Sequence, residues 1–292
     1  MQMKINKPPC RLLLKCMVLT TAVSLFPLTT ACAAAKAELW PRWQQNDPAN
    51  TQKIDHRLWD AWLKKYVVAP HPSGINRVRY DAVAREDRIS LKTYIENLQA
   101  VSISNYNRAE QKAFWINLYN ALTVDLILSR FPVTSIRDIN ISPGLVVRGP
   151  WGAKLVTVEG EKLSLDDIEH RILRPLWRDD RIHYALNWAS LGHPNLQPVA
   201  YTGANTESLL ERGAREFINH ERGVSLKNGQ LRVSSIYVWF LEDFGSSAEG
   251  LMEHWQKYAD PTLEDALAAY TGGLKHDYDW RLNGTDTQKK GN

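Results

Sequence analysis

The sequence predicts an α+β fold organised as a single domain. Several segments repeat apolar residues at helical spacing, and two short segments alternate apolar and polar residues around a tight turn. The two kinds of segment do not follow the regular strand-helix-strand order of a doubly wound sheet. Because no repeat or proline-rich linker interrupts the chain, we expect one domain over residues 34–283, followed by a flexible tail at 284–292.

Helices are predicted where apolar residues recur every third or fourth position. Segment 113–131 is apolar on nearly all sides, which is typical of a buried central helix, and Pro132 is expected to end it. Further helices are predicted over 54–66, 88–100, 206–219, 247–258 and 262–270.

Small antiparallel hairpins complete the predicted fold. One covers 154–163, and another covers 224–233, where Asn228 and Gly229 favour a type I′ turn. A short strand is predicted at 78–80.

Two further elements flank the polar motifs described below. A short helix is expected to begin at Ser164 or Asp166 and to be ended by Pro175. A strand at 183–186 is expected to lead into a loop at 187–198.

Residues 1–33 have the features of a secretory signal peptide. An uncharged apolar run, 17–31, follows a basic start and is too short for a membrane-spanning helix, which needs about 20 residues. The small residues around Cys32 suit cleavage to a soluble periplasmic or secreted protein. The segment ending at Cys32 also resembles a lipobox, in which case lipidation of Cys32 would be the only membrane attachment.

The charge and cysteine content exclude several classes of protein. The formal net charge is +4, and removing residues 1–33 takes away four basic residues and no acidic one, so the remainder is neutral. A neutral chain lacks the basic surface that nucleic-acid binding needs. All three cysteines lie at or before Cys32, so the domain is expected to have no internal disulfide. No motif indicates a cofactor or a metal.

Asn117 and Asn120 form a first polar cluster, on one face of the predicted central helix. A buried amide without partners costs about 1–3 kcal/mol, so each needs a hydrogen-bonding partner. Tying down neighbouring loops and binding a ligand are both compatible with the spacing.

A second cluster contains Glu169 and His170 on the short helix before Pro175. A histidine held by a carboxylate can serve as a general base, and a charged, solvated helix explains the same pattern.

The third polar cluster lies in the predicted loop at 187–198. Asn187, Trp188 and Ser190 are candidate ligand-binding residues, and His193 lies three positions after Ser190, as in a hydroxyl-base pair. The glycine-flanked turn of serine hydrolases is missing around Ser190.

Five ordered motifs resemble the family known as domain of unknown function 547. They are AFWINLYNALTVDLIL, FPVTSIRD, LSLDDIEHRILRP, RIHYALNWASLGHPNL and DYDWRLN, and they span about residues 80–283. The resemblance implies an α+β fold related to papain-like cysteine hydrolases, with a catalytic cysteine and histidine. It assigns the histidine to His170, with Glu169 as a carboxylate partner.

This chain departs from the family pattern where the nucleophile is expected. The family's loop has the pattern Asn-Cys-x-Ser-x-x-Cys-Pro, with cysteines where this chain has Trp188 and His193. Neither side chain replaces a thiolate.

Three functional classes therefore remain. In the first, the protein is a non-catalytic binder of a peptide or cell-envelope ligand, on which an exposed Trp188 would stack. The sequence is equally compatible with a Trp188 that only fills the space beside the helix. Alternatively, it is a hydrolase with altered chemistry, in which His170 and His193 would lie together as histidine catalysts or, with Glu169, as metal ligands. The third class is a structural module of the envelope.

Overall fold

The computed structural model describes residues 35–144 and 148–285. The predicted signal peptide, Cys32 and most of the predicted tail lie outside these residues. Within the described part, no helix is long and apolar enough to cross a membrane.

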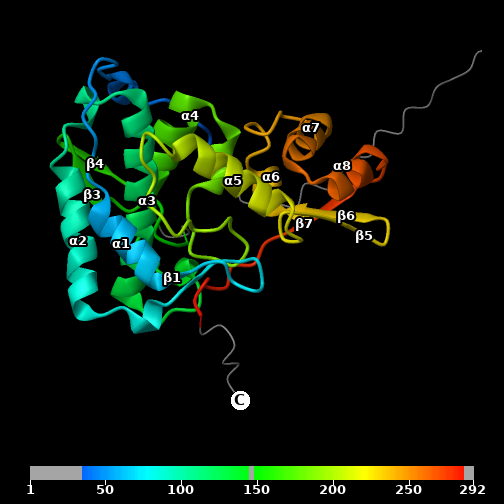
Figure 1. The fold of residues 1–292 in the computed structure, drawn as a ribbon, viewed down its shortest axis with the longest axis horizontal. Helices are drawn as coiled ribbons and strands as arrows, with labels where there is room; N and C mark the ends of the chain where they lie inside the picture. Colours follow the sequence, from blue (N-terminus) through cyan, green and yellow to red (C-terminus); the bar gives the residue numbers. More distant parts are fainter. Residues whose placement is uncertain (1–34, 145–147, 286–292) are drawn as a thin grey trace, which may run out of the picture. The chain divides into compact units, whose positions relative to one another are not determined.

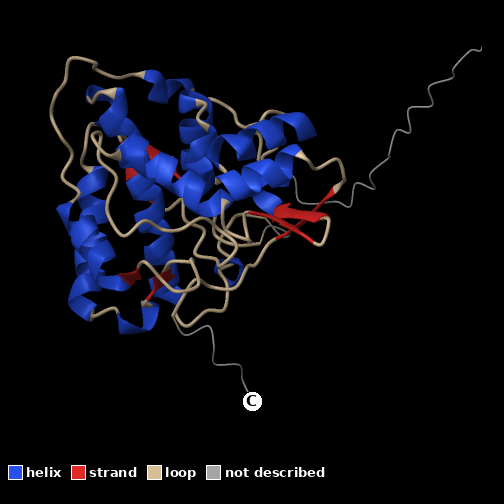
Figure 2. Ribbon diagram, turned by 45° about the vertical axis from the view of Figure 1, so that its right-hand side comes forward, coloured by secondary structure: helices blue, strands red, loops and turns tan. Residues whose placement is uncertain are grey.

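The α+β fold class is confirmed, with helices predominating and strands confined to short pairs and one three-stranded sheet (Figures 1 and 2). The α-helices are α1 (Arg57–Tyr66), α2 (Arg85–Gln99), α3 (Arg108–Arg130), α4 (Arg174–Trp177), α5 (Thr206–Ile218), α6 (Ser235–Trp239), α7 (Ala248–Tyr258) and α8 (Pro261–Ala268). The strands are β1 (Val67–Val68), β2 (Arg77–Val78), β3 (Val156–Val158), β4 (Glu161–Leu163), β5 (Val224–Lys227), β6 (Gln230–Ser234) and β7 (Leu274–Asp277). Single helical turns are η1 (Pro41–Gln44), η2 (Tyr80–Ala82), η3 (Ile103–Asn105), η4 (Ile136–Asp138) and η6 (Asp180–Tyr184), and η5 (Asp167–Leu173) is a π-helix.

Helix α3 is the buried central helix that the sequence predicts. Eighteen of its 23 residues are buried, and the side chain of Asn107 caps its N-terminus by accepting from the backbone of Ala109 and Glu110. Helix α2 packs along it (Figure 1), and η5 and α5 contact it as well. The element that positions the polar clusters is therefore enclosed by the core.

The two hairpins form at the predicted places. Strands β3 and β4 pair, as do β5 and β6, and both residues of the Asn228-Gly229 turn have positive φ, 51° and 70°. A type I′ turn needs this conformation at both positions. The sequence did not predict β7, which adds to β6 in parallel.

The prediction of a strand at 183–186 is wrong. The first half of this segment belongs to the 3-10 turn η6, and the second half is not in a strand. The Asp179 side chain accepts from the N–H of Arg181, and the turn closes through bonds such as Ala185 N–H to the Ile182 carbonyl. This cap and the hydrogen bonds of the turn outweigh the tendency of the segment to be extended. The strand expected at 78–80 likewise ends at Val78.

Pro175 does not end the helix before it, contrary to expectation. η5 continues into α4, which ends at Trp177 and is followed by Arg178, a C-cap residue with left-handed φ of 48°. A proline in a helix leaves the carbonyl four residues earlier without its donor. Here that carbonyl, of Arg171, accepts from Trp40 N–H at 3.0 Å, so the segment before η1 supplies the missing hydrogen bond.

Candidate functional site

The loop 187–196 is buried along its whole length rather than exposed at a surface. The chain near residue 280 covers it, and Leu191 and Gly192 donate to the carbonyls of Arg281 and Asp279 at 2.8 and 2.9 Å. A Cβ at Gly192 would lie 2.6 Å from the Asp279 nitrogen, so only glycine permits this approach.

The asparagines of α3 hold this loop and its neighbour in place. Asn120 donates to the Ala185 carbonyl at 2.8 Å and accepts from Asn187 N–H at 2.8 Å. Asn117 likewise donates to the Tyr201 carbonyl at 2.7 Å and accepts from the Tyr201 N–H at 3.0 Å. Both amides are therefore occupied by backbone groups, which is the tethering role that the sequence analysis considered.

Asn187 and Ser190 also point inward. Asn187 accepts from the N–H of Ala189 at 3.0 Å, and the hydroxyl of Ser190 pairs with the Tyr278 hydroxyl at 2.6 Å. Tyr278 also pairs with His193 Nδ1 at 3.0 Å, so it lies between the two residues expected to form a hydroxyl-base pair. Ser190 and His193 share this tyrosine as their hydrogen-bonding partner.

Trp188 is buried, with 8 % of its surface exposed, so the expectation of an exposed indole is wrong. Its ring stacks on His193 with centroids 4.6 Å apart and planes 13° apart. Burial lowers the pKa of His193 well below its usual value, and the nearby His183 and Arg222 lower it further. His193 is thus a neutral stacking partner.

Four half-buried aromatic residues surround this stack, and we call them the aromatic group: Trp151, Trp239, Tyr278 and Trp280. Trp239 and Trp280 lie nearly parallel to the Trp188 ring, with centroids 6.1 and 5.9 Å away, and Trp151 meets it edge-on at 5.8 Å. The side chain of Trp188 therefore forms the buried base of the group.

His170 is not held by Glu169. Its Nδ1 atom accepts from Arg174 Nη1 at 3.1 Å, and its Nε2 atom lies 3.7 Å from Asp166 Oδ1. The pKa of His170 is lowered to about 3, first by burial and then by the positive charge of Arg174. A histidine that stays neutral at so low a pH is a poor general base at neutral pH.

Glu169 instead faces the interior under Trp188. Only 2 % of its surface is exposed, and its carboxylate accepts from the Tyr119 hydroxyl at 2.9 Å. Burial raises the pKa of Glu169 to about 7, although Arg174 and Tyr119 oppose the shift. The indole N–H of Trp188 also favours the charged carboxylate, without completing a hydrogen bond of normal geometry.

A histidine held by a carboxylate near Glu169 is His183, which the sequence predicts to lie in a strand. His183 Nε2 lies 2.7 Å from Asp243 Oδ2, and its Nδ1 lies 3.9 Å from Glu169. Burial alone would raise the pKa of Asp243, but hydrogen bonds from His183 and Arg174 lower it to about 2. Burial lowers the pKa of His183.

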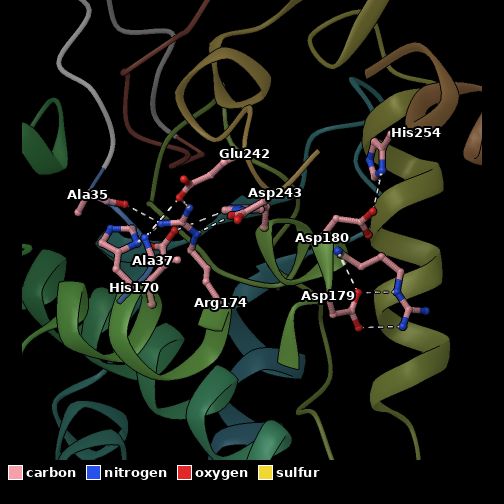
Figure 3. Close-up of polar contacts among 12 residues, drawn as sticks. Ala35, Ala37, His170, Arg174, Asp179, Asp180, Glu242, Asp243 and His254 are labelled. Carbon is pink, nitrogen blue, oxygen red and sulfur yellow. Dashed lines mark hydrogen bonds and ion pairs between the residues drawn. The ribbon is translucent and has the colours of Figure 1, made fainter. Parts of the chain in front are cut away.

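These contacts connect Glu169 to the surface near Arg174. Figure 3 shows Arg174 between His170 and two acidic residues, Glu242 and Asp243, which it contacts at 2.9 and 2.5 Å. The chain of contacts therefore runs from a buried carboxyl group through His183 to Arg174. No sequence motif signals it, because Asp243 lies 60 residues after His183.

The structure does not gather His170, His193 and Glu169 as metal ligands. Among residues 35–144 and 148–285, no group of three or more histidine, cysteine, aspartate or glutamate side chains is arranged to hold a metal ion. The metal-based alternative therefore has no geometric support in this part of the chain.

Comparison with known families supports the resemblance over part of the chain. Residues 103–218 match the family described as Protein of unknown function, DUF547. The matched segment contains α3, η5 and the loop 187–196, and lies within the range 80–283 that the motifs span. Neither a curated protein nor a solved structure matches the chain. The segment that carries α3 and the buried loop is therefore similar in sequence to the DUF547 family.

Proposed function

We propose that the protein is a non-catalytic binder of a peptide or cell-envelope ligand, on a scaffold related to cysteine hydrolases. The proposal places it outside the cytoplasm, as the basic and apolar start of the sequence suggests. The stack of Trp188 on His193, at the two positions where the family pattern has cysteine, is the observation that carries the proposal.

The chemistry of the loop supports binding rather than catalysis. No cysteine follows Cys32, and both hydroxyl and imidazole groups of the loop are bound to Tyr278. A nucleophile needs an adjacent base and access to substrate. Ser190 is 2 % exposed and has a tyrosine as its partner.

The aromatic group supplies the ligand-facing surface in this proposal. Its members are half-buried, so each keeps some contact with solvent, while the buried ring of Trp188 packs against them. Partly exposed indoles bind apolar faces of ligands at a low entropic cost because their side chains have few rotatable bonds. Arg137 lies 4.9 Å from the centroid of the Trp280 ring and adds a cation beside this surface.

A titration of the purified protein with soluble peptidoglycan fragments and with short peptides, followed by tryptophan fluorescence, tests the proposal. We expect saturable quenching that Trp239→Ala and Trp280→Ala each weaken at least tenfold. Trp177→Ala is the matched control, since Trp177 is also half-buried but contacts Arg108 instead. Equal affinity in all three variants, or no saturable binding to either kind of ligand, would contradict the proposal.

One observation favours a second function, a hydrolase with altered chemistry. His183 is oriented by Asp243 and faces Glu169, which is the arrangement of a base held by a carboxylate. Both His183 and Glu169 are only 2 % exposed, so a substrate would have to displace Trp188 to reach them. If the protein released smaller products from the same peptidoglycan fragments or peptides, and His183→Gln abolished this release, the protein would be a hydrolase rather than only a binder.

A further inference from the structure

A pocket of about 430 Å³ lies at the outer end of the contacts that begin at Glu169. Six charged side chains line it: Arg174, Arg178, Asp179, Asp180, Glu242 and Asp243. Figure 3 shows most of them, with Arg174, Glu242 and Asp243 on one side and Asp179 and Asp180 on the other. Its volume is within the range of small-molecule sites, about 300–1,000 Å³.

Two of the acidic residues already have cationic partners inside the protein. Asp179 accepts from Lys112 and Arg181 at 2.7 and 2.8 Å. Asp243 is bound by Arg174 at 2.5 Å. Neither carboxylate needs a ligand to balance its charge.

Two other charges in the pocket are not balanced in this way. Asp180 has His254 as its partner, at 3.0 Å, and no lysine or arginine of the described residues forms an ion pair with it. Arg178 is exposed, and within the described chain its guanidinium has no hydrogen bond or ion pair. Glu242 shares Arg174 with Asp243, and its side chain is 48 % exposed, so the Arg174 side of the pocket carries one more negative than positive charge.

We propose that this pocket binds a short zwitterionic peptide or amino acid. The ligand's ammonium group lies against Asp180, and its carboxylate pairs with Arg178, which can bind it through two parallel hydrogen bonds. The pocket therefore offers one carboxylate, Asp180, that forms no ion pair with a lysine or arginine of the described residues, and one unpaired guanidinium, Arg178, which together complement a ligand with one charge of each sign. None of its lining residues belongs to the aromatic group, so this proposal does not depend on the ligand proposed there.

Isothermal titration of the full protein with alanyl-alanine tests the assignment, with the N-acetylated and C-amidated dipeptides as comparisons. We expect the free dipeptide to bind, and each blocked form to bind at least tenfold more weakly. Asp180→Asn should abolish the preference for a free amino group while the amide oxygen still accepts from His254. Arg178→Gln should abolish the preference for a free carboxylate.

Glu253→Gln and Arg85→Gln are matched controls, because both residues are exposed and lie outside the pocket. Both should bind like the unchanged protein. Absence of heat with the free dipeptide, equal binding of the free and blocked forms, or equal losses in the controls would each overturn the assignment. If a variant fails to fold, the comparison of free and blocked dipeptides on the unchanged protein still tests whether the pocket recognises both charges of the ligand.

Discussion

The indole of Trp188 and the imidazole of His193 stack with centroids 4.6 Å apart, inside a loop that is buried from end to end. The two rings fill the positions at which the family resemblance leads us to expect cysteine. Both rings are buried, so neither presents an accessible group for covalent chemistry, and Trp188 packs against the aromatic group and interacts with Glu169.

Trp188→Ala should remove the base of the aromatic group and leave a cavity. We expect the free energy of unfolding to fall by about 3–5 kcal/mol, as for other buried tryptophans. Urea denaturation measures the loss, and free indole should partly restore the midpoint of the variant while leaving the unchanged protein as it is. A loss below about 1 kcal/mol, without rescue, would show that the stack contributes little.

Asn120→Ala should loosen the loop from α3. The Ala185 carbonyl and the Asn187 N–H would both lose their partner in a buried environment. Each unsatisfied group costs about 1–3 kcal/mol, so for the two groups we expect a total loss of about 2–6 kcal/mol by urea denaturation. Asn46→Ala, which removes one long exposed hydrogen bond to Gln44, is the control and should change stability by less than about 0.5 kcal/mol.

Glu169 should make the folded state less stable as the pH rises. The pKa of its carboxyl group is about 7 in the folded protein, against 4.5 for an ordinary glutamate, so the folded state holds the proton between these values and the unfolded state does not. Stability contributed by this group is complete below pH 4.5 and is lost by about pH 7, a change of about 3 kcal/mol. Denaturation of Glu169→Gln should show a stability that falls less from pH 5 to pH 8. A parallel pH dependence in variant and unchanged protein would contradict the shift.

His170 should make the folded state less stable as the pH falls, the opposite of the effect of Glu169. Its pKa is about 3 in the folded protein and 6.5 in an ordinary histidine, so only the unfolded state takes up a proton between these values. Stability is complete above pH 6.5 and falls as the pH decreases, by about 2 kcal/mol at pH 5 for this single group. His170→Gln should lose less stability between pH 7 and pH 5, measured by thermal unfolding. An unchanged slope would mean that His170 is protonated in the folded state.

Local signals made much of the fold predictable. The buried helix α3 follows from a long apolar segment, and the β5–β6 turn follows from Asn228 and Gly229, because few residue pairs tolerate positive φ at both positions. β7 could not be predicted in this way, since its residues Leu274–Asp277 do not alternate and the strand depends on pairing with β6.

The candidate site was predictable only in part. The sequence singled out Asn117 and Asn120, which hold the loop, and Glu169, but it missed the aromatic group and placed His170 as the base. The pairing of His183 with Asp243 joins η6 to the turn after α6, and such contacts depend on tertiary packing rather than on spacing along the chain. The prediction that Trp188 is exposed was also wrong, because the half-buried rings that cover it come from distant segments of the chain.

The central claim is that the protein binds its ligand without changing it. Its most direct test is mass spectrometry of a peptidoglycan-fragment mixture that has been incubated with the protein, separated into bound and free fractions, and compared with the starting material. The claim predicts that a subset of fragments is enriched in the bound fraction with every mass unchanged, and that Trp239→Ala abolishes the enrichment. New, smaller masses that appear with the unchanged protein and not with His183→Gln would contradict it.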